Sequence, residues 1–310
     1  MIDKTHFTGI VLSKSNGKIL VSINNQEVWC RLGSQQWEET PVPGDAVTVV
    51  WQTDQEGELI NLQPRRNKLS RRAAAPKPGA FPQEQIIAAN VDLVVPVFSI
   101  TKPELKWNLL DRYLVLAESA GIPALICITK LDQLRTLKPA QQAELRDRLD
   151  LYRTLGYAVI ETSCVNQEGI DTLVETLTGS ISILMGKSGV GKTSLMNQIL
   201  PGQDLRVGAV SEKLKKGRHT TSFVKAYAMD NSSYVIDAPG MRELGLWDVF
   251  PEDLPAYFPE MRPFLGSCKF RLNCQHEDEP GCAIRQAVMN GKIDPYRYAS
   301  YLRLKEEDDV

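Results

Sequence analysis

The sequence lacks a strong charge of either sign. It has 36 Lys and Arg residues against 38 Asp and Glu residues, a formal net charge of -2, which excludes a globally basic nucleic-acid binder. It also lacks a secretory pattern and any apolar run long enough to span a bilayer, because runs such as 91–100 are interrupted by Asp92 and Pro96. We therefore expect a cytoplasmic protein without a membrane association, whose six cysteines are thiols or metal ligands before they are disulfides.

Short apolar strands dominate residues 1–65, for example at 19–23, 28–32 and 46–51, with Gly and Asn between them. Five such strands favour a small OB-type β-barrel, a fold often used for single-stranded nucleic acid. An SH3-like barrel with a structural role is the alternative. The segment holds eight Asp and Glu residues against five Lys and Arg residues, which weakens a simple electrostatic argument for RNA.

Residues 66–85 are predicted to form a linker that is first basic and then rich in Ala, Pro and Gly. The cations around its start could be a solvated run or an arm that contacts RNA, and the pattern alone leaves both open. They are Arg65, Arg66, Lys68, Arg71 and Arg72.

Strand and helix patterns alternate through residues 86–245. Buried strands are predicted at 91–98, 124–128 and 181–185, with helical spacing between them, which indicates a mostly parallel sheet covered by helices. Ligands bind at the carboxyl ends of such strands, and each motif described below follows a strand. We expect an α/β nucleotide-binding domain here.

A complete phosphate loop, Gly-x-x-x-x-Gly-Lys-Thr, follows the strand at 181–185. Its glycines allow backbone N–H groups to close around phosphates, its lysine reaches the β- and γ-phosphates, and its threonine can bind Mg²⁺. The predicted phosphate-binding residues are Gly186, Lys187, Ser188, Gly189, Val190, Gly191, Lys192, Thr193 and Ser194.

A guanine-reading box, Thr129-Lys130-Leu131-Asp132, precedes this loop in the chain. A carboxylate such as Asp132 can accept two hydrogen bonds from guanine that adenine cannot donate, which favours GTP over ATP. Thr129 stands where Asn is usual, so one amide contact is lost or replaced by the hydroxyl. Backbone N–H groups of Ser163 and Cys164 are expected near the guanine carbonyl. In an ordinary small GTPase the phosphate loop comes first, so this order predicts a circularly permuted GTPase. A P-loop ATPase or kinase is the competing interpretation.

Asp237-Ala238-Pro239-Gly240 follows another strand. Asp237 is expected to hold Mg²⁺ through water, and the Gly240 N–H to meet the γ-phosphate.

The residue after Gly240 is methionine, which cannot orient a nucleophilic water. His219, within Gly-Arg-His-Thr-Thr at 217–221, is the candidate for that role; it could instead bind phosphate or RNA, or shape the loop. Thr220 or Thr221 is expected to bind Mg²⁺.

Three cysteines and one histidine cluster between residues 268 and 282, in the segment 246–310 where two helices follow. Cys268, Cys274, His276 and Cys282 would satisfy a tetrahedral zinc ion without an open position, which predicts a structural site. Four unrelated residues are the alternative, made improbable by three of six cysteines falling in so short a stretch.

These motifs together resemble the ribosome small-subunit-dependent GTPase A family. The residues that carry the resemblance are Gly-Lys-Ser-Gly-Val-Gly-Lys-Thr-Ser at 186–194, Gly-Arg-His-Thr-Thr at 217–221 and Cys-Lys-Phe-Arg at 268–271. Two positions depart from the family pattern: Thr129 replaces Asn, and one additional residue separates Cys268 from Cys274.

The resemblance implies an OB-type barrel in residues 1–65, a circularly permuted P-loop GTPase in 86–245 and a helical zinc module in 246–310. It implies Mg²⁺-dependent hydrolysis of GTP to GDP, stimulated by the small (30S) ribosomal subunit during its late maturation, with the barrel and the zinc module contacting 16S rRNA and with other assembly factors as possible partners. His219, Lys192 and Gly240 are the implied catalytic groups. We expect a monomer. A docking module in which hydrolysis is incidental is the alternative.

Overall fold

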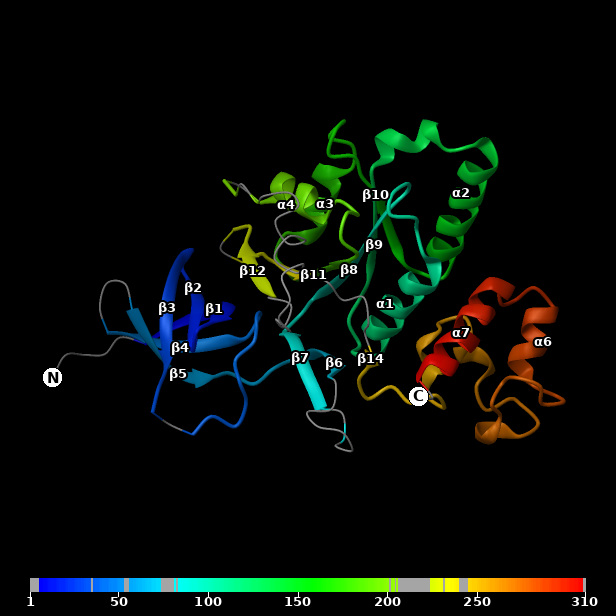
Figure 1. Cartoon of the computed structure of the whole chain (residues 1–310). Coiled ribbons are helices and arrows are strands. Elements are labelled where there is room, and N and C mark those ends of the chain that lie inside the picture. Colours follow the sequence, from blue (N-terminus) through cyan, green and yellow to red (C-terminus); the bar gives the residue numbers. More distant parts are fainter. Residues whose placement is uncertain are drawn as a thin grey trace.

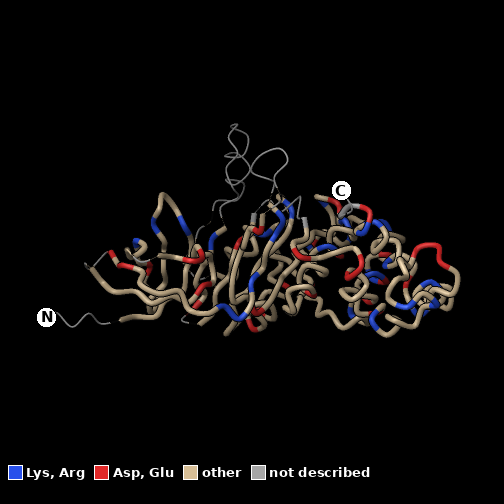
Figure 2. Tube along the Cα trace, turned by 90° about the horizontal axis from the view of Figure 1, so that it is seen from below, with Lys and Arg blue, Asp and Glu red and all other residues tan. Residues whose placement is uncertain are grey.

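The computed structural model describes residues 6–34, 36–52, 56–73, 81, 83–200, 202–203, 205, 224–230, 232–239 and 245–308. The chain forms three parts in a row, with an N-terminal barrel and a C-terminal helical module on opposite sides of a central α/β domain (Figure 1). Lys and Arg are interspersed with Asp and Glu along the part of the chain that the structure describes (Figure 2). This agrees with a net charge close to zero.

The N-terminal part is a closed five-stranded barrel in the order β1-β2-β3-β5-β4, which confirms the predicted OB-type architecture. Its interior is filled by branched side chains such as Val11, Ile19, Val49 and Leu59, all fully buried. β3 and β5 pair in parallel, whereas the other pairs are antiparallel. The strands are β1 (His6–Ser15), β2 (Lys18–Ile23), β3 (Gln26–Leu32), β4 (Ala46–Trp51) and β5 (Glu56–Leu62).

The segment predicted as a linker contains a strand, which corrects that interpretation. β6 (Lys68–Ala73) pairs antiparallel with β7 (Gln83–Ala89) and with the short β14 (Gly245–Leu246). Two of the cations near its start are engaged with carboxylates. Arg65 donates two hydrogen bonds of 2.7 and 2.8 Å to the buried Asp45, and Lys68 forms an ion pair with Glu84 at 2.8 Å. The basic sequence concealed this strand, of whose two partners β7 comes next in the chain and β14 lies far along it.

The central domain is built on a six-stranded sheet in the order β10-β9-β8-β11-β13-β12, parallel except for the edge strand β12. A parallel sheet buried on both faces explains the continuous apolar strands of the sequence. The strands are β8 (Leu93–Ser99), β9 (Leu125–Thr129), β10 (Ala158–Glu161), β11 (Ile181–Gly186), β12 (Lys225–Ala228) and β13 (Tyr234–Pro239). Two of the predicted strands begin one or two residues later than expected.

Helices cover both faces of this sheet. On one face α1 (Trp107–Ser119) and α2 (Pro139–Thr154) pack against alternate residues of β8 and β9, such as Val94 and Ile126. On the other face α3 (Ile170–Leu177) and α4 (Lys192–Ile199) pack against the intervening residues, such as Val95 and Leu125. This three-layer arrangement leaves the carboxyl ends of the strands free to carry loops.

The barrel packs directly on the edge of the sheet that carries β12 and β13. Leu12 and Leu20, on the outer surface of the barrel, belong to the same apolar cluster as the central domain, and the Tyr234 hydroxyl lies 3.4 Å from that of Ser22. The barrel therefore shares a core with the sheet and is not simply tethered to it.

The C-terminal module consists of three 3₁₀ turns and two helices. They are η2 (Leu254–Tyr257), η3 (Arg262–Phe264), η4 (Arg271–Asn273), α6 (Ala283–Met289) and α7 (Pro295–Asp308), while η1 (Leu131–Thr136) belongs to the central domain. Asp294 caps α7, accepting the Tyr296 N–H at 2.8 Å, and Pro295 is its first residue.

A buried ionic network joins this module to the central domain. Arg297 of α7 donates to Glu260 at 2.6 Å and to Asp111 of α1, which also accepts the Tyr152 hydroxyl at 2.6 Å. Arg297 and Asp111 are essentially inaccessible to solvent. Removing one partner would leave a buried charge unpaired, so the network fixes how the module sits on the domain. Among the described residues, no helix is both long and apolar enough to span a membrane.

Candidate functional site

The predicted motifs meet at one edge of the central sheet. β9 ends at Thr129, β10 ends just before Thr162 and Ser163, and β11 ends at Gly186, which is paired in register with Pro239 of β13. Because these strands are parallel, their carboxyl ends lie at the same edge. The structure thus brings together the guanine box, the phosphate loop and Asp237, which are spread over more than 100 residues of the chain, from 129 to 237.

The backbone of the phosphate loop requires glycine at three positions. A Cβ atom on Gly186 would lie 2.4 Å from the carbonyl oxygen of Val97 in the adjacent strand. Gly189 and Gly191 have φ angles of +86° and +102°, a region that favours glycine. Gly191 directly precedes α4, so the loop presents the N-terminus of a helix to whatever it encloses, an arrangement suited to phosphate. Lys187, Ser188 and Val190 lie within the loop, and Thr193 and Ser194 in the first turn of α4.

Lys192 and Asp237 are a desolvated pair beside the loop. The Lys192 ammonium donates to the carbonyl of Gly186 at 2.6 Å; burial lowers its pKa, an effect that the charge of Asp237 opposes. Burial likewise raises the pKa of Asp237, and Lys192 opposes that shift. Within the described part of the chain, Oδ1 of Asp237 is buried and has no hydrogen-bond partner. A buried carboxylate oxygen without a donor fits a cation or its bound water.

The guanine box is held in a defined conformation. Lys130 has a positive φ of 66°, and its ammonium donates to the carbonyl of Gly189 at 2.8 Å and to that of Lys102. Asp132 accepts a 2.7 Å hydrogen bond from the Ser163 hydroxyl, which itself accepts the Asn166 N–H. These contacts hold one carboxylate oxygen of Asp132 in place and lay the lysine stem beside the loop.

Thr129 connects this box to the phosphate loop. Thr129 is almost fully buried, and its hydroxyl, which has one proton to donate, lies 3.1 Å from the carbonyl oxygen of Phe98 and 2.5 Å from that of Val190. The hydroxyl therefore supplies a contact between the strand end and the loop. Ser163 is fully buried, and Cys164, predicted as a neighbour of the base, is partly exposed; its pKa is raised by burial and by nearby Asp132.

The loop after β8 also belongs to this site, although no motif indicated it. The Lys102 carbonyl accepts from Lys130, and Thr101 donates to Gln133 of η1 at 2.6 Å. The position of this loop in the sequence could have indicated it. The loop follows β8, a buried strand of the same parallel sheet, whose carboxyl end lies at the same edge. His219, Thr220, Thr221 and Gly240, which were also predicted to be part of the site, lie outside the described residues.

The second predicted site is in the C-terminal module, where Cys268, Cys274, His276 and Cys282 converge. Their candidate ligand atoms all lie within 4.8 Å of one another, and all four residues are buried. The Nδ1 atom of His276 is 3.6 Å from Sγ of Cys268 and 3.5 Å from Sγ of Cys282. Tetrahedral zinc, with bonds of about 2.3 Å to sulfur and about 2.0 Å to nitrogen, places its ligands roughly 3.5–3.8 Å apart. The donor set and spacing fit that ion.

Protonation and surrounding contacts also suit a structural metal. Burial lowers the pKa of His276, which favours the neutral imidazole that binds metals, and raises the pKa of the Cys274 thiol to about 12, so that metal binding must displace its proton. The backbone N–H groups of Ala283 and Arg285 point at the sulfurs of Cys268 and Cys282 at 3.2 and 3.4 Å. Such contacts orient ligands and stabilise thiolates.

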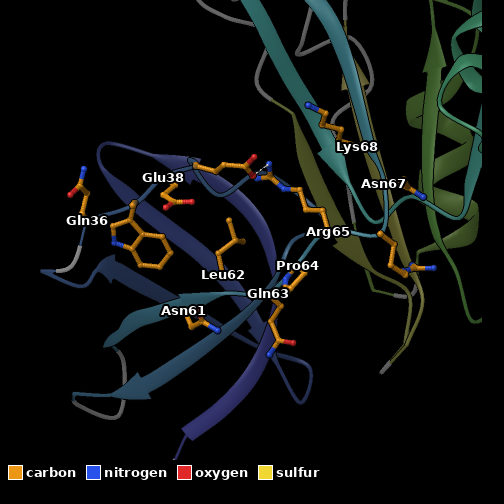
Figure 3. Close-up of a pocket in the computed structure, with 12 residues that line it drawn as sticks. Gln36, Glu38, Asn61, Leu62, Gln63, Pro64, Arg65, Asn67 and Lys68 are labelled. Atoms are coloured by element: carbon orange, nitrogen blue, oxygen red, sulfur yellow. Dashed lines mark hydrogen bonds and ion pairs between the residues drawn. The ribbon is translucent and has the colours of Figure 1, made fainter. Parts of the chain in front are cut away.

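A groove of about 650 Å³ lies elsewhere, between the barrel and the start of β6. Its lining includes Trp37, Asn61, Gln63 and Arg65, the last of which points towards the barrel (Figure 3). Arg65 already holds Asp45 and Glu39, so its charge is neutralised there. The groove is separate from the nucleotide motifs.

The fold and the first site define a class. A parallel sheet with a phosphate loop, an acidic strand end and a guanine box that comes first in the chain is a circularly permuted P-loop GTPase. The sequence model for "RsgA GTPase" matches residues 62–247, and the chain belongs to this family. It is therefore a GTP hydrolase, as the sequence predicted.

Comparisons with individual proteins agree over nearly the whole chain. The small ribosomal subunit biogenesis GTPase RsgA of Hahella chejuensis is 41% identical over 87% of this chain and 75% of its own length. That of Actinobacillus pleuropneumoniae is 36% identical over 97% and 85%. The crystal structure of YjeQ from Thermotoga maritima matches with a TM-score of 0.77 at 30% identity, covering 98% of this chain and 99% of that one. YloQ, described as a circularly permuted GTPase, gives a TM-score of 0.73 at 30% identity, covering 100% and 97%.

Proposed function

We propose that this GTPase acts in late maturation of the small ribosomal subunit, hydrolysing GTP to GDP and phosphate when it is stimulated by that subunit. The carrying observation is the similarity to relatives named small ribosomal subunit biogenesis GTPases, which covers 87–97% of the chain and includes both modules that flank the GTPase domain. This role supports a cytoplasmic location. We also propose that the protein is a monomer that contacts 16S rRNA through its barrel and its zinc module, with other assembly factors as further partners.

In this proposal the guanine base binds at the end of β9. Asp132 accepts the two guanine N–H groups, and the Lys130 stem lies along the base. The backbone N–H groups of Ser163 and Cys164 face the guanine carbonyl. The support is the rigid setting of Asp132, fixed by Ser163 at 2.7 Å. An unpaired carboxylate would penalise adenine, so the site selects GTP over ATP.

The phosphates bind in the loop at 186–194. Its backbone N–H groups enclose them and Lys192 donates to the β- and γ-oxygens, which reduces the repulsion that opposes attack. Magnesium would be held by Thr193, by a switch threonine (Thr221 or its neighbour Thr220) and, through water, by Asp237, where it would neutralise charge on the phosphates. The buried, unpartnered oxygen of Asp237 supports this assignment. The Gly240 N–H is assigned to the γ-phosphate.

His219 is proposed to orient or deprotonate the attacking water. The support comes from the sequence: methionine at 241 occupies the position of the water-positioning glutamine in Ras-type GTPases, and a thioether has no suitable hydrogen-bonding group. We assign zinc to Cys268, Cys274, His276 and Cys282, with a structural role, because their donor set leaves no open coordination position.

The deciding experiment is steady-state GTP hydrolysis by the purified protein, alone and with isolated 30S subunits, at catalytic enzyme concentrations. ATP and 50S subunits are the controls. A large increase specific to GTP and to 30S subunits is expected. Slow turnover that is indifferent to the 30S subunit would refute the proposal and favour a docking module in which hydrolysis is incidental.

A further inference from the structure

The loop between β8 and α1, residues 100–106, contacts the guanine box at two points. The Thr101 hydroxyl donates to the side-chain oxygen of Gln133 at 2.6 Å, and the Lys102 carbonyl accepts from the Lys130 ammonium. Lys130 and Gln133 flank the carboxylate of the box in the sequence. A shift of this loop would therefore shift the segment that carries the carboxylate.

α1 begins directly after this loop, and its first turns are anchored from within the protein. Trp107, the first residue of the helix, stacks on Tyr152 of α2, with ring centroids 5.9 Å apart and an interplanar angle of 18°. The Tyr152 hydroxyl donates at 2.6 Å to Asp111, which lies one turn after Trp107 on α1. Tyr152 and Asp111 are fully buried. The end of the loop is thus fixed by the surroundings of Asp111.

Arg297 of α7 supplies the positive charge beside Asp111. It donates to one oxygen of Asp111 and, at 2.6 Å, to Glu260, and its guanidinium lies 4.5 Å from the centroid of the Phe258 ring. The other oxygen of Asp111 is buried and has no hydrogen-bond partner within the described part of the chain. Without Arg297, Asp111 would be a buried carboxylate with the Tyr152 hydroxyl as its remaining donor, a situation that is strongly unfavourable.

α7 is itself held in place by the zinc-binding loop. The Tyr298 hydroxyl donates to the His276 carbonyl at 2.5 Å, and the Tyr301 hydroxyl and the Lys305 ammonium donate to the Gln275 carbonyl at 3.1 and 3.0 Å. These three side chains recur at helical spacing along α7. The helix, which lies beside α1 (Figure 1), is therefore fixed to the zinc-binding loop by this row and to α1 by the ionic network.

We propose that Arg297 is a positioning residue for guanine recognition. Through Asp111 it holds the start of α1, and through the loop at 100–106 it keeps Asp132 in the conformation that binds the base. Arg297 lies in the C-terminal module and acts only through α1, since packed helices and buried hydrogen-bond networks can carry such effects between distant sites. The inference rests on the proposed role of Asp132 and adds a residue on which that role depends.

The ratio of the Kd for inosine triphosphate to the Kd for GTP, measured by competition with a fluorescent guanine nucleotide, tests this. Inosine lacks the exocyclic amine assigned to Asp132. Arg297→Gln should lower the ratio at least about fivefold, because a charge-assisted hydrogen bond to the base is weakened. A partly unfolded protein loses binding sites but keeps the ratio. Arg262→Gln, which breaks an ion pair of the same module with Glu118 at the other end of α1, is the matched control and should keep the wild-type ratio.

Two further variants keep the test decisive. Asp111→Asn retains the shape of the side chain and leaves Arg297 paired with Glu260, so it should fold, and it should lower the ratio in the same direction as Arg297→Gln. Thr101→Val removes the contact between the loop and the guanine box. Combined with Asp111→Asn it should lower the ratio by less than the product of the two single effects, because both variants act through the same loop.

Zinc content and thermal unfolding show whether each variant is intact. An unchanged ratio in intact Arg297→Gln or Asp111→Asn, fully multiplicative effects in the double variant, or an equal loss in Arg262→Gln would overturn the inference and leave the assignment of the base to Asp132 standing. A wild type that does not distinguish GTP from inosine triphosphate would instead refute that assignment, and this inference with it.

Discussion

Thr129→Val is the substitution that tests how the guanine box is connected to the phosphate loop. Valine has nearly the same shape as threonine, so the main change is the loss of a hydroxyl whose single proton lies between the carbonyl oxygens of Phe98 and Val190. Residue 129 is only 2% exposed, so water cannot readily replace the lost donor.

The magnitude follows from this burial. A buried acceptor that loses its donor costs about 1–3 kcal/mol, and we expect the free energy of unfolding to fall by that amount. Only the Val190 contact lies in the phosphate loop. If about 1 kcal/mol of the loss falls on the ordering of that loop, the Kd for GDP and GTP should rise roughly fivefold. The preference for GTP over ATP should not change, because Asp132 remains fixed by Ser163.

Urea unfolding and titration with a fluorescent guanine nucleotide measure the two effects separately. Thr129→Ser, which keeps the hydroxyl, is the matched control and should retain nearly wild-type affinity. If Thr129→Val unfolds and binds nucleotide like the wild type, the hydroxyl does not support the loop and our interpretation is wrong. A loss of guanine selectivity would instead place Thr129 in base recognition.

Four further substitutions address the remaining assignments. Asp132→Asn should shift preference from GTP towards xanthosine triphosphate in a competition assay, and no shift would remove Asp132 from base recognition. His219→Ala should lower subunit-stimulated turnover by about 10²-fold or more while affinity for a GTP analogue stays within a few fold; unchanged turnover would exclude a hydrolytic role. Cys274→Ala should lose zinc by elemental analysis and lower the melting temperature, and full zinc retention would contradict the assignment. Gly186→Ala should weaken nucleotide binding at least about tenfold, since its Cβ would meet the Val97 carbonyl at 2.4 Å; wild-type affinity would show that the strands can separate at little cost.

Features with a local signal were predictable from the sequence. The phosphate loop at 186–194, the acidic strand end at Asp237 and the cysteine-histidine cluster each depend on residues close together in the chain. Their positions after buried strands were enough to place the nucleotide motifs at one edge of the sheet.

Features that depend on distant pairing were not predictable. β6 was assigned to a linker because its sequence is basic and because one of its partners, β14, lies far along the chain, where Gly245 pairs with Arg72. The contribution of Lys102 was missed because its backbone carbonyl, which any residue type has, accepts from Lys130. The sequence also did not predict that Arg65 forms a buried ion pair with Asp45, because a basic run does not indicate which carboxylates will lie next to it in the fold.

The pairing of β14 with β6 limits how far the nucleotide site can move independently of the rest of the protein. β13, which carries Asp237, ends at Pro239, and β14 begins at Gly245, so the chain between these two residues can extend to at most about 22 Å. β14 is hydrogen-bonded to β6, and β6 follows the barrel directly in the chain. When this connection is fully extended, a further displacement of Asp237 must either move β6 as well or break the hydrogen bonds between β14 and β6. The short connection from β13 to β14 therefore links the strand that carries Asp237 to β6, the strand that follows the barrel in the chain.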